Sequence, residues 1–179
     1  MSNIVYIATS LDGYIADENG GIDWLHAIPN PENDDFGWAK FLNRIDALIM
    51  GRKTFETILS FGGDWPYPKP VFVLSNSIKT IPTSIKSKVQ IISGPLNKII
   101  TDLNNKGFHN LYIDGGKTIQ SFLKEDLIDE IIVTQIPILL GNGIPLFAKL
   151  SAPLNFEFIK TEVHLNALVQ NHYRRKRDS

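Results

Sequence analysis

The chain has 179 residues, of which 43% are hydrophobic, so it can bury one sizeable core with little left over for a second. Its net charge of -1 argues against a nucleic-acid binder that works through a broad basic surface. Cysteine is absent and the 4 histidines lack metal-ligand spacing, which excludes disulfides, a thiolate metal site and a cysteine nucleophile. We therefore expect a single domain over residues 1–179 with no metal.

The sequence shows neither a leader nor a membrane span. No cationic region followed by a long apolar stretch opens the chain, and no apolar window is long enough to cross a bilayer. The basic run Arg174-Arg175-Lys176-Arg177 is interpreted as a solvated tail after the last strand. These features predict a cytoplasmic protein that binds neither a membrane nor nucleic acid.

The first part of the chain predicts a buried strand, a long irregular segment and a helix. Residues 3–9 are rich in β-branched and aromatic side chains, which is typical of a central strand. Glycine and proline interrupt residues 10–35, and a connection of that length is usually functional or disordered; Trp24 should anchor it. Asn33 or Asp34 can cap the helix that follows. Its apolar face would carry Trp38, Phe41, Leu42 and Ile45.

Residues 47–55 and 111–119 share one order of features, namely an apolar run, a glycine, a cation, a threonine and a helical pattern. Each predicts a buried strand that ends at the first turn of a helix, whose free N–H groups and dipole attract an anion. Two such ends in one parallel sheet predict a ligand with more than one phosphate, for which a dinucleotide is the natural candidate. The alternative is a pair of ordinary strand-to-helix turns, where glycine and threonine serve conformation and capping.

The remaining elements predict the fold class. Further strands are expected at residues 70–74, 89–93, 130–136, 156–163 and 167–174, the last two as an antiparallel hairpin. Helix faces are expected at Phe55, Ile58 and Leu59, at Leu96, Ile99, Ile100 and Leu103, and at Ile119, Phe122 and Leu123. Residues 137–147 should form an irregular connection. The order predicts an α/β fold with a mixed, mostly parallel sheet of about eight strands and about four helices on both faces.

Three motifs carry a family resemblance. They are Ser10-Leu11-Asp12-Gly13-Tyr14-Ile15-Ala16, Met50-Gly51-Arg52-Lys53-Thr54-Phe55-Glu56 and Leu139-Leu140-Gly141-Asn142-Gly143-Ile144-Pro145-Leu146-Phe147. With the strand pattern between them, the chain resembles the dihydrofolate reductase superfamily over nearly its whole length. It is most similar to the branch of the riboflavin-biosynthesis reductase, the RibD C-terminal domain. The resemblance implies the three-layer dihydrofolate reductase-like fold and, from relatives of this branch, a homodimer.

The resemblance implies NADPH as the cofactor. It assigns cofactor contacts to Ala8, Ile15, Gly51, Arg52, Lys53, Thr54, Ser75, Asn76, Asp114, Gly115, Gly116, Lys117 and Thr118. Within this set, Arg52, Ser75 and Asn76 match the adenosine 2′-phosphate side, and residues 114–118 match the turn under the pyrophosphate, where a cis peptide is common. Backbone groups at Ala8 and Ile15 match the positions that hold the nicotinamide carboxamide.

A proton donor must accompany hydride transfer to a C=N bond, and a carboxyl group with a raised pKa can serve. Asp35 is the candidate, because its spacing to Gly51 equals that of the folate-reductase carboxylate, and Thr134 matches the threonine that supports that carboxylate. The alternative is that Asp34 or Asp35 only caps the helix. Trp24 is assigned with Asp35 to the substrate pocket, with a role as a core anchor as its alternative.

Three functions stay open. The first is an NADPH-dependent reductase of a pyrimidine or pteridine-like ring, with 5-amino-6-(5-phosphoribosylamino)uracil as the model substrate. The zinc deaminase motifs H-x-E and P-C-x-x-C are absent, so the bifunctional riboflavin enzyme is not expected. The second is a true or promiscuous dihydrofolate reductase, favoured by Asp35 and Thr134 and disfavoured by Asp114, which departs from the all-glycine form. The third is a nucleotide-binding protein without turnover.

Overall fold

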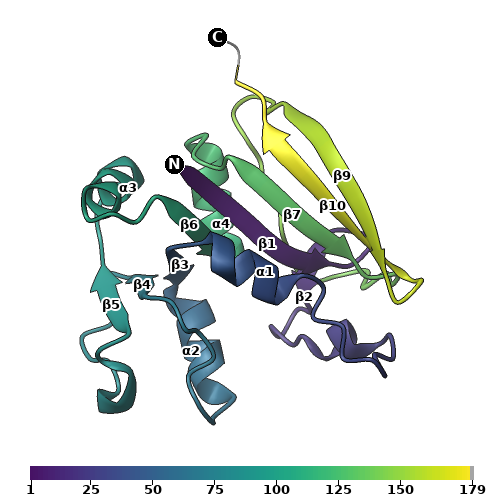
Figure 1. Cartoon of the computed structure of the whole chain (residues 1–179), viewed down its shortest axis with the longest axis horizontal. Coiled ribbons are helices and arrows are strands. Elements are labelled where there is room, and N and C mark those ends of the chain that lie inside the picture. Colours follow the sequence, from purple (N-terminus) through teal and green to yellow (C-terminus); the bar gives the residue numbers. More distant parts are fainter. Residues whose placement is uncertain (178–179) are drawn as a thin grey trace.

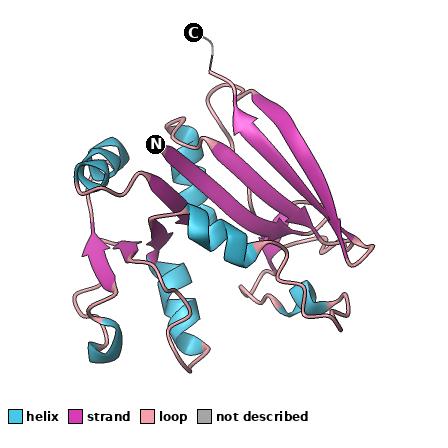
Figure 2. Ribbon diagram, in the orientation of Figure 1, coloured by secondary structure: helices cyan, strands magenta, loops and turns pink. Residues whose placement is uncertain are grey.

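A computed structural model describes residues 1–177 and contains an eight-stranded sheet in the order β5-β4-β3-β6-β1-β7-β10-β9 (Figures 1 and 2). Its strands are β1 (Ser2–Thr9), β3 (Ala47–Gly51), β4 (Val71–Leu74), β5 (Val89–Ile92), β6 (Asn110–Asp114), β7 (Glu130–Gln135), β9 (Phe156–His164) and β10 (Leu168–Arg175). The strands from β5 to β7 run parallel, whereas β10 and β9 add an antiparallel hairpin. The predicted mixed sheet is confirmed.

Helices cover both faces of this sheet. They are α1 (Trp38–Arg44), α2 (Arg52–Ser60), α3 (Leu96–Asn105) and α4 (Gly116–Lys124), with short 3-10 helices η1 (Asp23–His26) and η2 (Thr83–Ile85). Phe41 of α1 and Phe55 of α2 belong to one buried cluster, and Leu103 of α3 and Phe122 of α4 belong to the other. The helices therefore place one core on each face, as the apolar stripes predict.

Strand β3 explains why an unbroken apolar run is needed at the centre of the sheet. Ala47 and Ile49 belong to the cluster under α3 and α4, while Leu48 and Met50 belong to the cluster under α1 and α2. All four side chains are fully buried. Because successive residues point to opposite faces, a strand that is covered on both sides must be apolar at every position.

A small second sheet lies in segments that were predicted to be irregular. It pairs β2 (Tyr14–Ala16) with β8 (Ile144–Pro145). Two of the three resemblance motifs, at residues 10–16 and 139–147, therefore lie side by side. The Asp12 carboxylate strengthens this junction, since it accepts the Ser10 hydroxyl at 2.6 Å and the Gly141 N–H at 2.8 Å. We call β2, β8 and the connecting turns the β2–β8 arch.

The predicted cap of α1 and two residues of the predicted helix faces need correction. Helix α1 begins at Trp38 after Gly37, which has a φ of 85°, so neither Asn33 nor Asp34 is its cap. Ile45 lies just beyond the helix in extended conformation, although its side chain is buried. Leu59 of α2 is 37% exposed and turns away from the core, whereas Phe55 carries the packing.

The end of the chain also differs from the prediction. Arg175 pairs with Asp126 at 2.7 Å, and Arg177 pairs with Asp129 at 2.6 Å, so these arginines are held by carboxylates instead of forming a solvated tail. None of the helices in residues 1–177 has the length and apolar character that crossing a bilayer requires.

Candidate functional site

The sheet has a topological switch point between its neighbouring strands β3 and β6. The two strands run parallel, with Met50 opposite Asp114. Helix α2 leaves β3 toward the α1 face, and helix α4 leaves β6 toward the α3 face. Open α/β sheets bind their ligands outside the carboxyl ends of the strands at such a point. Both segments that repeat the glycine, cation and threonine order are therefore brought to one edge of the sheet.

Reciprocal contacts between glycine and threonine join the two helix starts. Gly51 is the N-cap of α2, and a Cβ atom placed on it would lie 2.7 Å from the Thr118 hydroxyl of α4. Gly115 is the N-cap of α4, and a Cβ atom there would overlap the Thr54 hydroxyl of α2. Within residues 1–177 neither hydroxyl has a hydrogen-bond partner. Two helix N-termini thus lie side by side with free hydroxyl groups.

Cations accompany both helix starts. Lys53 and Lys117 are exposed and pair with no carboxylate in the described part of the chain. Arg52 makes a weak contact of 3.5 Å with Glu56 one turn along α2, and its side chain is 48% exposed. An exposed ion pair of this kind contributes little, so Arg52 remains available to an anion. This edge of the sheet therefore combines helix dipoles with unneutralised positive charge.

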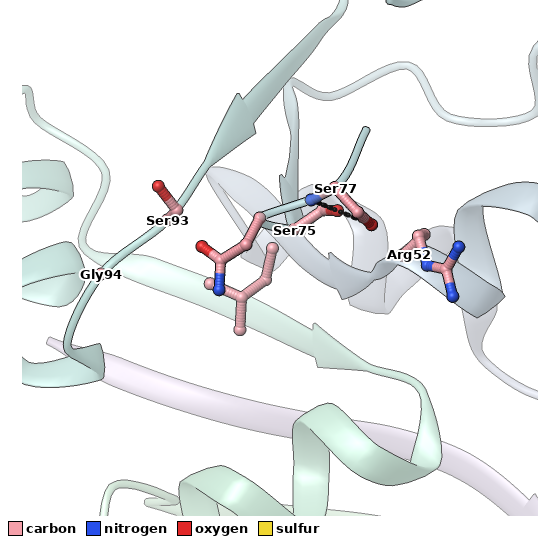
Figure 3. Close-up of a pocket in the computed structure, with 7 residues that line it drawn as sticks. Arg52, Ser75, Ser77, Ser93 and Gly94 are labelled. Carbon is pink, nitrogen blue, oxygen red and sulfur yellow. Dashed lines mark hydrogen bonds between the residues drawn. The ribbon is translucent and has the colours of Figure 1, made fainter. Parts of the chain in front are cut away.

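A cavity of about 320 Å³ continues this edge at the ends of β4 and β5 (Figure 3). It is lined by Arg52, Leu74, Ser75, Asn76, Ser77, Ser93 and Gly94. The Ser75 hydroxyl accepts N–H bonds from Ser77 and Ile78 at 3.1 Å, which fixes the turn after β4. One cation, hydroxyls and an amide line the cavity, with no acidic side chain among them, and this donor set suits a phosphate group.

Asp114, the last residue of β6, lies on the face of the sheet that carries α1 and α2, opposite to the face that carries α4. Tyr112 belongs to the α1 and α2 cluster, and Asp114, two residues later, shares that face. Its carboxylate accepts the Gly115 N–H at 2.8 Å. Burial nevertheless raises the pKa of Asp114 above its usual value, and burial together with the nearby Asp114 charge raises the pKa of Tyr67.

The glycine turn after β6 is built without the cis peptide that the resemblance implies. All peptide bonds in residues 1–177 are trans, and Gly115 instead adopts a φ of 90°. Residues other than glycine rarely tolerate this conformation. The turn at residues 114–118 is otherwise where the sequence pattern places it.

Ala8 lies near the end of β1, and Ile15 lies at the start of α4. Strand β6 pairs with β1 only at residues 2–4, so the last residues of β1 extend past β6 with β7 as their one neighbouring strand. Ala8 lies in this extension, opposite Thr134 of β7. The Ile15 side chain from the arch reaches α4, since a Cβ atom on Gly116 would lie 2.7 Å from it.

Asp35 and Thr134 do not pair with each other. The exposed Asp35 carboxylate accepts N–H bonds, both of 2.9 Å, from Gly37, the N-cap residue of α1, and from Ala39 in the first turn of that helix. The Thr134 hydroxyl accepts a bond of 3.0 Å from the amide nitrogen of Gln170. Gln170 was not predicted from the sequence. Gln170 lies two residues after the buried Leu168 in β10, so the two side chains share the inward face of that strand.

Trp24 lies in η1, within the long segment before α1, and is partly buried. Its indole N–H is buried and has no hydrogen-bond partner in the described residues. Trp24 does not line the cavity at Arg52. Within residues 1–177, no group of histidine, aspartate and glutamate side chains could hold a metal ion.

The family model of the RibD C-terminal domain matches residues 3–169. The chain belongs to this family. It is also 36% identical over 173 residues to the uncharacterized protein YwjB of Bacillus subtilis (strain 168), with 95% of both chains covered.

Solved structures of RibD C-terminal domain relatives agree with this membership. A protein of Shewanella sp. PV-4, provisionally named as a riboflavin biosynthesis protein, is 58% identical, with a TM-score of 0.96 and coverage of 99% of this chain and 100% of that one. A deaminase and 5-amino-6-(5-phosphoribosylamino)uracil reductase of Thermotoga maritima is 17% identical, with a TM-score of 0.73. It is covered over 56% of its own length and 98% of this chain, and at that identity the likeness shows the fold alone.

Proposed function

We propose that the protein is an NADPH-dependent reductase that transfers hydride to a pyrimidine or pteridine-like ring. The observation that carries this proposal is the pair of helix N-termini at the β3–β6 switch point, where Gly51 and Gly115 each lie against a threonine of the other helix. A dinucleotide has two linked phosphates that match two adjacent anion sites. Family membership in the RibD C-terminal domain supports the same reaction class.

The residues present fit the cofactor. The pyrophosphate would lie at the N–H groups of the first turns of α2 and α4, with Lys53 and Lys117 adding charge and Thr54 and Thr118 donating hydroxyl bonds. A Cβ atom at Gly115 would fill this cradle, which explains its glycine. When bound, NADPH supplies the hydride.

The two ends of the cofactor would then have separate sites. The adenosine 2′-phosphate would lie in the cavity at Arg52, Ser75 and Asn76, where a second cation–phosphate contact distinguishes NADPH from NADH. The nicotinamide would lie at the end of β1, near Ala8 and under Ile15. The acceptor ring would lie next to the nicotinamide, on the face of the sheet that carries α1.

Two carboxyl groups are candidates for holding the proton that the reduced ring takes up. Asp114 lies on the face of the sheet that carries α1 and α2, and burial raises its pKa, which supports it as a proton donor to the acceptor ring. Asp35 is exposed and already accepts two backbone N–H bonds, which supports its helix-cap alternative and weakens the folate-reductase alternative. We expect Asp114→Asn to lower kcat by about 100-fold with NADPH affinity retained. The same result for Asp35→Asn would restore Asp35 to the site.

The experiment that tests the cofactor assignment is a tryptophan-quenching titration with NADPH and with NADH. The wild type should bind NADPH about 100-fold more tightly, which corresponds to about 2.7 kcal/mol for a charge-assisted phosphate contact. Arg52→Ala should remove most of this preference, since the contact with the 2′-phosphate is lost. The matched control is Arg174→Ala, on the exposed part of β10 at the opposite end of the sheet.

Equal affinities for both nucleotides would contradict the 2′-phosphate assignment, and binding of neither would contradict the reductase. If NADPH is preferred as expected, the physiological acceptor is to be sought among aminopyrimidines, starting with 5-amino-6-(5-phosphoribosylamino)uracil, and pterins. Tight NADPH binding without reduction of any acceptor would favour the nucleotide-binding alternative. We also propose, from the family resemblance, that the reductase is a cytoplasmic homodimer.

A further inference from the structure

The segment before α1 has an unusual backbone. Asn33, Phe36 and Gly37 have φ angles of 52°, 56° and 85°. Asparagine and glycine adopt this left-handed conformation readily, but a bulky residue such as phenylalanine is strained in it. Such strain persists only where the surroundings over-determine the conformation, and it is concentrated at functional sites.

Contacts from three other parts of the chain hold Phe36. Its carbonyl oxygen accepts the Tyr6 hydroxyl at 2.5 Å and the Gln170 amide at 3.1 Å. Its N–H donates to Asp34 at 2.7 Å, and the other oxygen of that carboxylate pairs with His164 at 2.9 Å. The Phe36 and His164 rings meet edge to face with centroids 5.5 Å apart. The end of β9, at the turn of the β9–β10 hairpin, is thus bonded to the segment before α1.

Gln170 is the centre of this network and is 2% exposed. Its amide nitrogen lies 3.0 Å from the Thr134 hydroxyl, 3.1 Å from the Phe36 carbonyl and 3.2 Å from the Tyr6 hydroxyl. Its amide oxygen lies 3.1 Å from a ring nitrogen of His172. Every polar atom of Gln170 therefore has a protein partner, so Gln170 has nothing left to offer a ligand and can act only through its neighbours.

The network lies where the nicotinamide is proposed to bind. Ala8 of β1 pairs with Thr134 of β7, and Thr134 pairs with Gln170 of β10, so the three form one row across the sheet near the carboxyl end of β1. Tyr6 shares this face of β1 and packs on Phe41 of α1, with ring centroids 4.5 Å apart. The strained segment therefore borders the α1 face beside the end of β1.

We propose that residues 34–37 form a rigid wall of the acceptor side of the site, and that Gln170 is the positioning residue that holds this wall. The inference rests on the proposed reductase function. A preformed wall fixes the acceptor ring against the nicotinamide without ordering a loop during binding. Its loss should weaken acceptor binding and leave the distant phosphate contacts of the cofactor unchanged.

The test compares Gln170→Met, which keeps the volume and removes the hydrogen bonds, with Asn171→Ala on the opposite face of β10. The probe is 5-amino-6-(5-phosphoribosylamino)uracil with NADPH. We expect Gln170→Met to raise the KM of the probe about 10-fold, as the loss of about 1.4 kcal/mol implies, with NADPH affinity and kcat changed less than about 2-fold. Amide exchange at residues 33–39 should become several-fold faster. Asn171→Ala should change neither quantity.

Tyr6→Phe gives a second, milder variant, because it removes one donor to Phe36 and keeps the ring stacked on Phe41. It should move the KM in the same direction. An unchanged KM in both variants, or equal losses in probe and NADPH affinity, would overturn the positioning role. If the wild type binds NADPH but its rate does not saturate with the probe, residues 34–37 do not form part of the acceptor site, and the positioning role of Gln170 is also refuted. A wild type that binds no NADPH would instead refute the proposed function.

Discussion

Gly115 and Gly107 offer a matched pair at the residue scale, because both have a φ of 90°. A Cβ atom at Gly107 would meet open space, whereas one at Gly115 would overlap the Thr54 hydroxyl. Gly107→Ala should therefore cost only the backbone strain of about 1–2 kcal/mol, and Gly115→Ala should cost more. Denaturant unfolding measures both costs.

The same pair separates strain from function. Gly115→Ala should also lower NADPH affinity at least about 10-fold, since the added methyl group displaces Thr54 in the phosphate cradle. Gly107→Ala should bind NADPH as the wild type does, because it lies beyond α3. Similar nucleotide affinities in the two variants would place the pyrophosphate away from Gly115.

Asp114 predicts a pH dependence of stability. Burial raises its pKa in the folded state, so the protonated carboxyl group stabilises the fold. This stabilisation is fully present below the unfolded pKa of about 3.9, and it is lost as the pH rises through the folded pKa. Asp114→Asn imitates the protonated group. The variant should be more stable than the wild type at pH 7 and equal to it below about pH 4.

Unfolding free energies measured across this pH range test the prediction, with Asp102→Asn on the exposed face of α3 as the control. A wild type that is more stable than Asp114→Asn at pH 7 would mean that the ionised carboxylate stabilises the fold. If Asp114→Asn is more stable than the wild type at pH 7, Asp114 lowers the stability of the fold, which agrees with a functional role for this residue.

Which residues meet at the site could be predicted only in part. The glycine and threonine positions of residues 51–54 and 115–118 follow from local chain geometry, and parallel strands bring their carboxyl ends to one edge. The contact between Thr134 and Gln170 depends on which residues of β7 and β10 lie opposite each other in the antiparallel pairing. No spacing rule reaches across that distance in the chain, so Asp35 was matched to Thr134 by resemblance alone.

At the scale of elements, the β2–β8 arch depends on Asp12. Its pKa is lowered, first by the Ser10 hydroxyl and then by the N–H groups of Gly141 and Leu140. Because the pKa is lowered, the stabilisation that the Asp12 carboxylate gives the arch is present above the unfolded pKa and is lost as the pH falls through the folded pKa. We expect Asp12→Ala to speed amide exchange of residues 139–146 at pH 7, with little effect on α3.

The same variant should weaken NADPH binding only a few-fold, because the arch contributes Ile15 over the start of α4 and leaves the phosphate cradle intact. Exchange measured at about pH 3 should differ less between Asp12→Ala and the wild type. Unchanged exchange at residues 139–146 would show that β-pairing alone holds the arch.

Element prediction succeeded where the periodicity extended over several turns or a full strand. The stripe Leu96, Ile99 and Leu103 is buried in α3, and the pattern of residues 156–174 forms the hairpin, with its turn at Leu165 and Asn166 in the left-handed conformation. Strands β2 and β8 could not be found this way. They have 3 and 2 residues, too few for a period, and tertiary contacts stabilise them.

At the scale of the whole molecule, the family resemblance predicts a homodimer. Strand β9 forms the free edge of the sheet and leaves Phe158 and Val163 61% and 63% exposed. Light scattering at micromolar protein concentration should give twice the mass of one chain. A mass equal to one chain, unchanged by NADPH, would contradict the dimer.

The central claim is that a dinucleotide phosphate lies across the two helix starts at the β3–β6 switch point. A crystal structure of the protein with NADP⁺ tests it most directly. We expect the pyrophosphate between the N-termini of α2 and α4, and the 2′-phosphate beside Arg52 and Ser75. A nucleotide bound elsewhere, or no nucleotide at the two helix starts at saturating concentration, would refute this binding site.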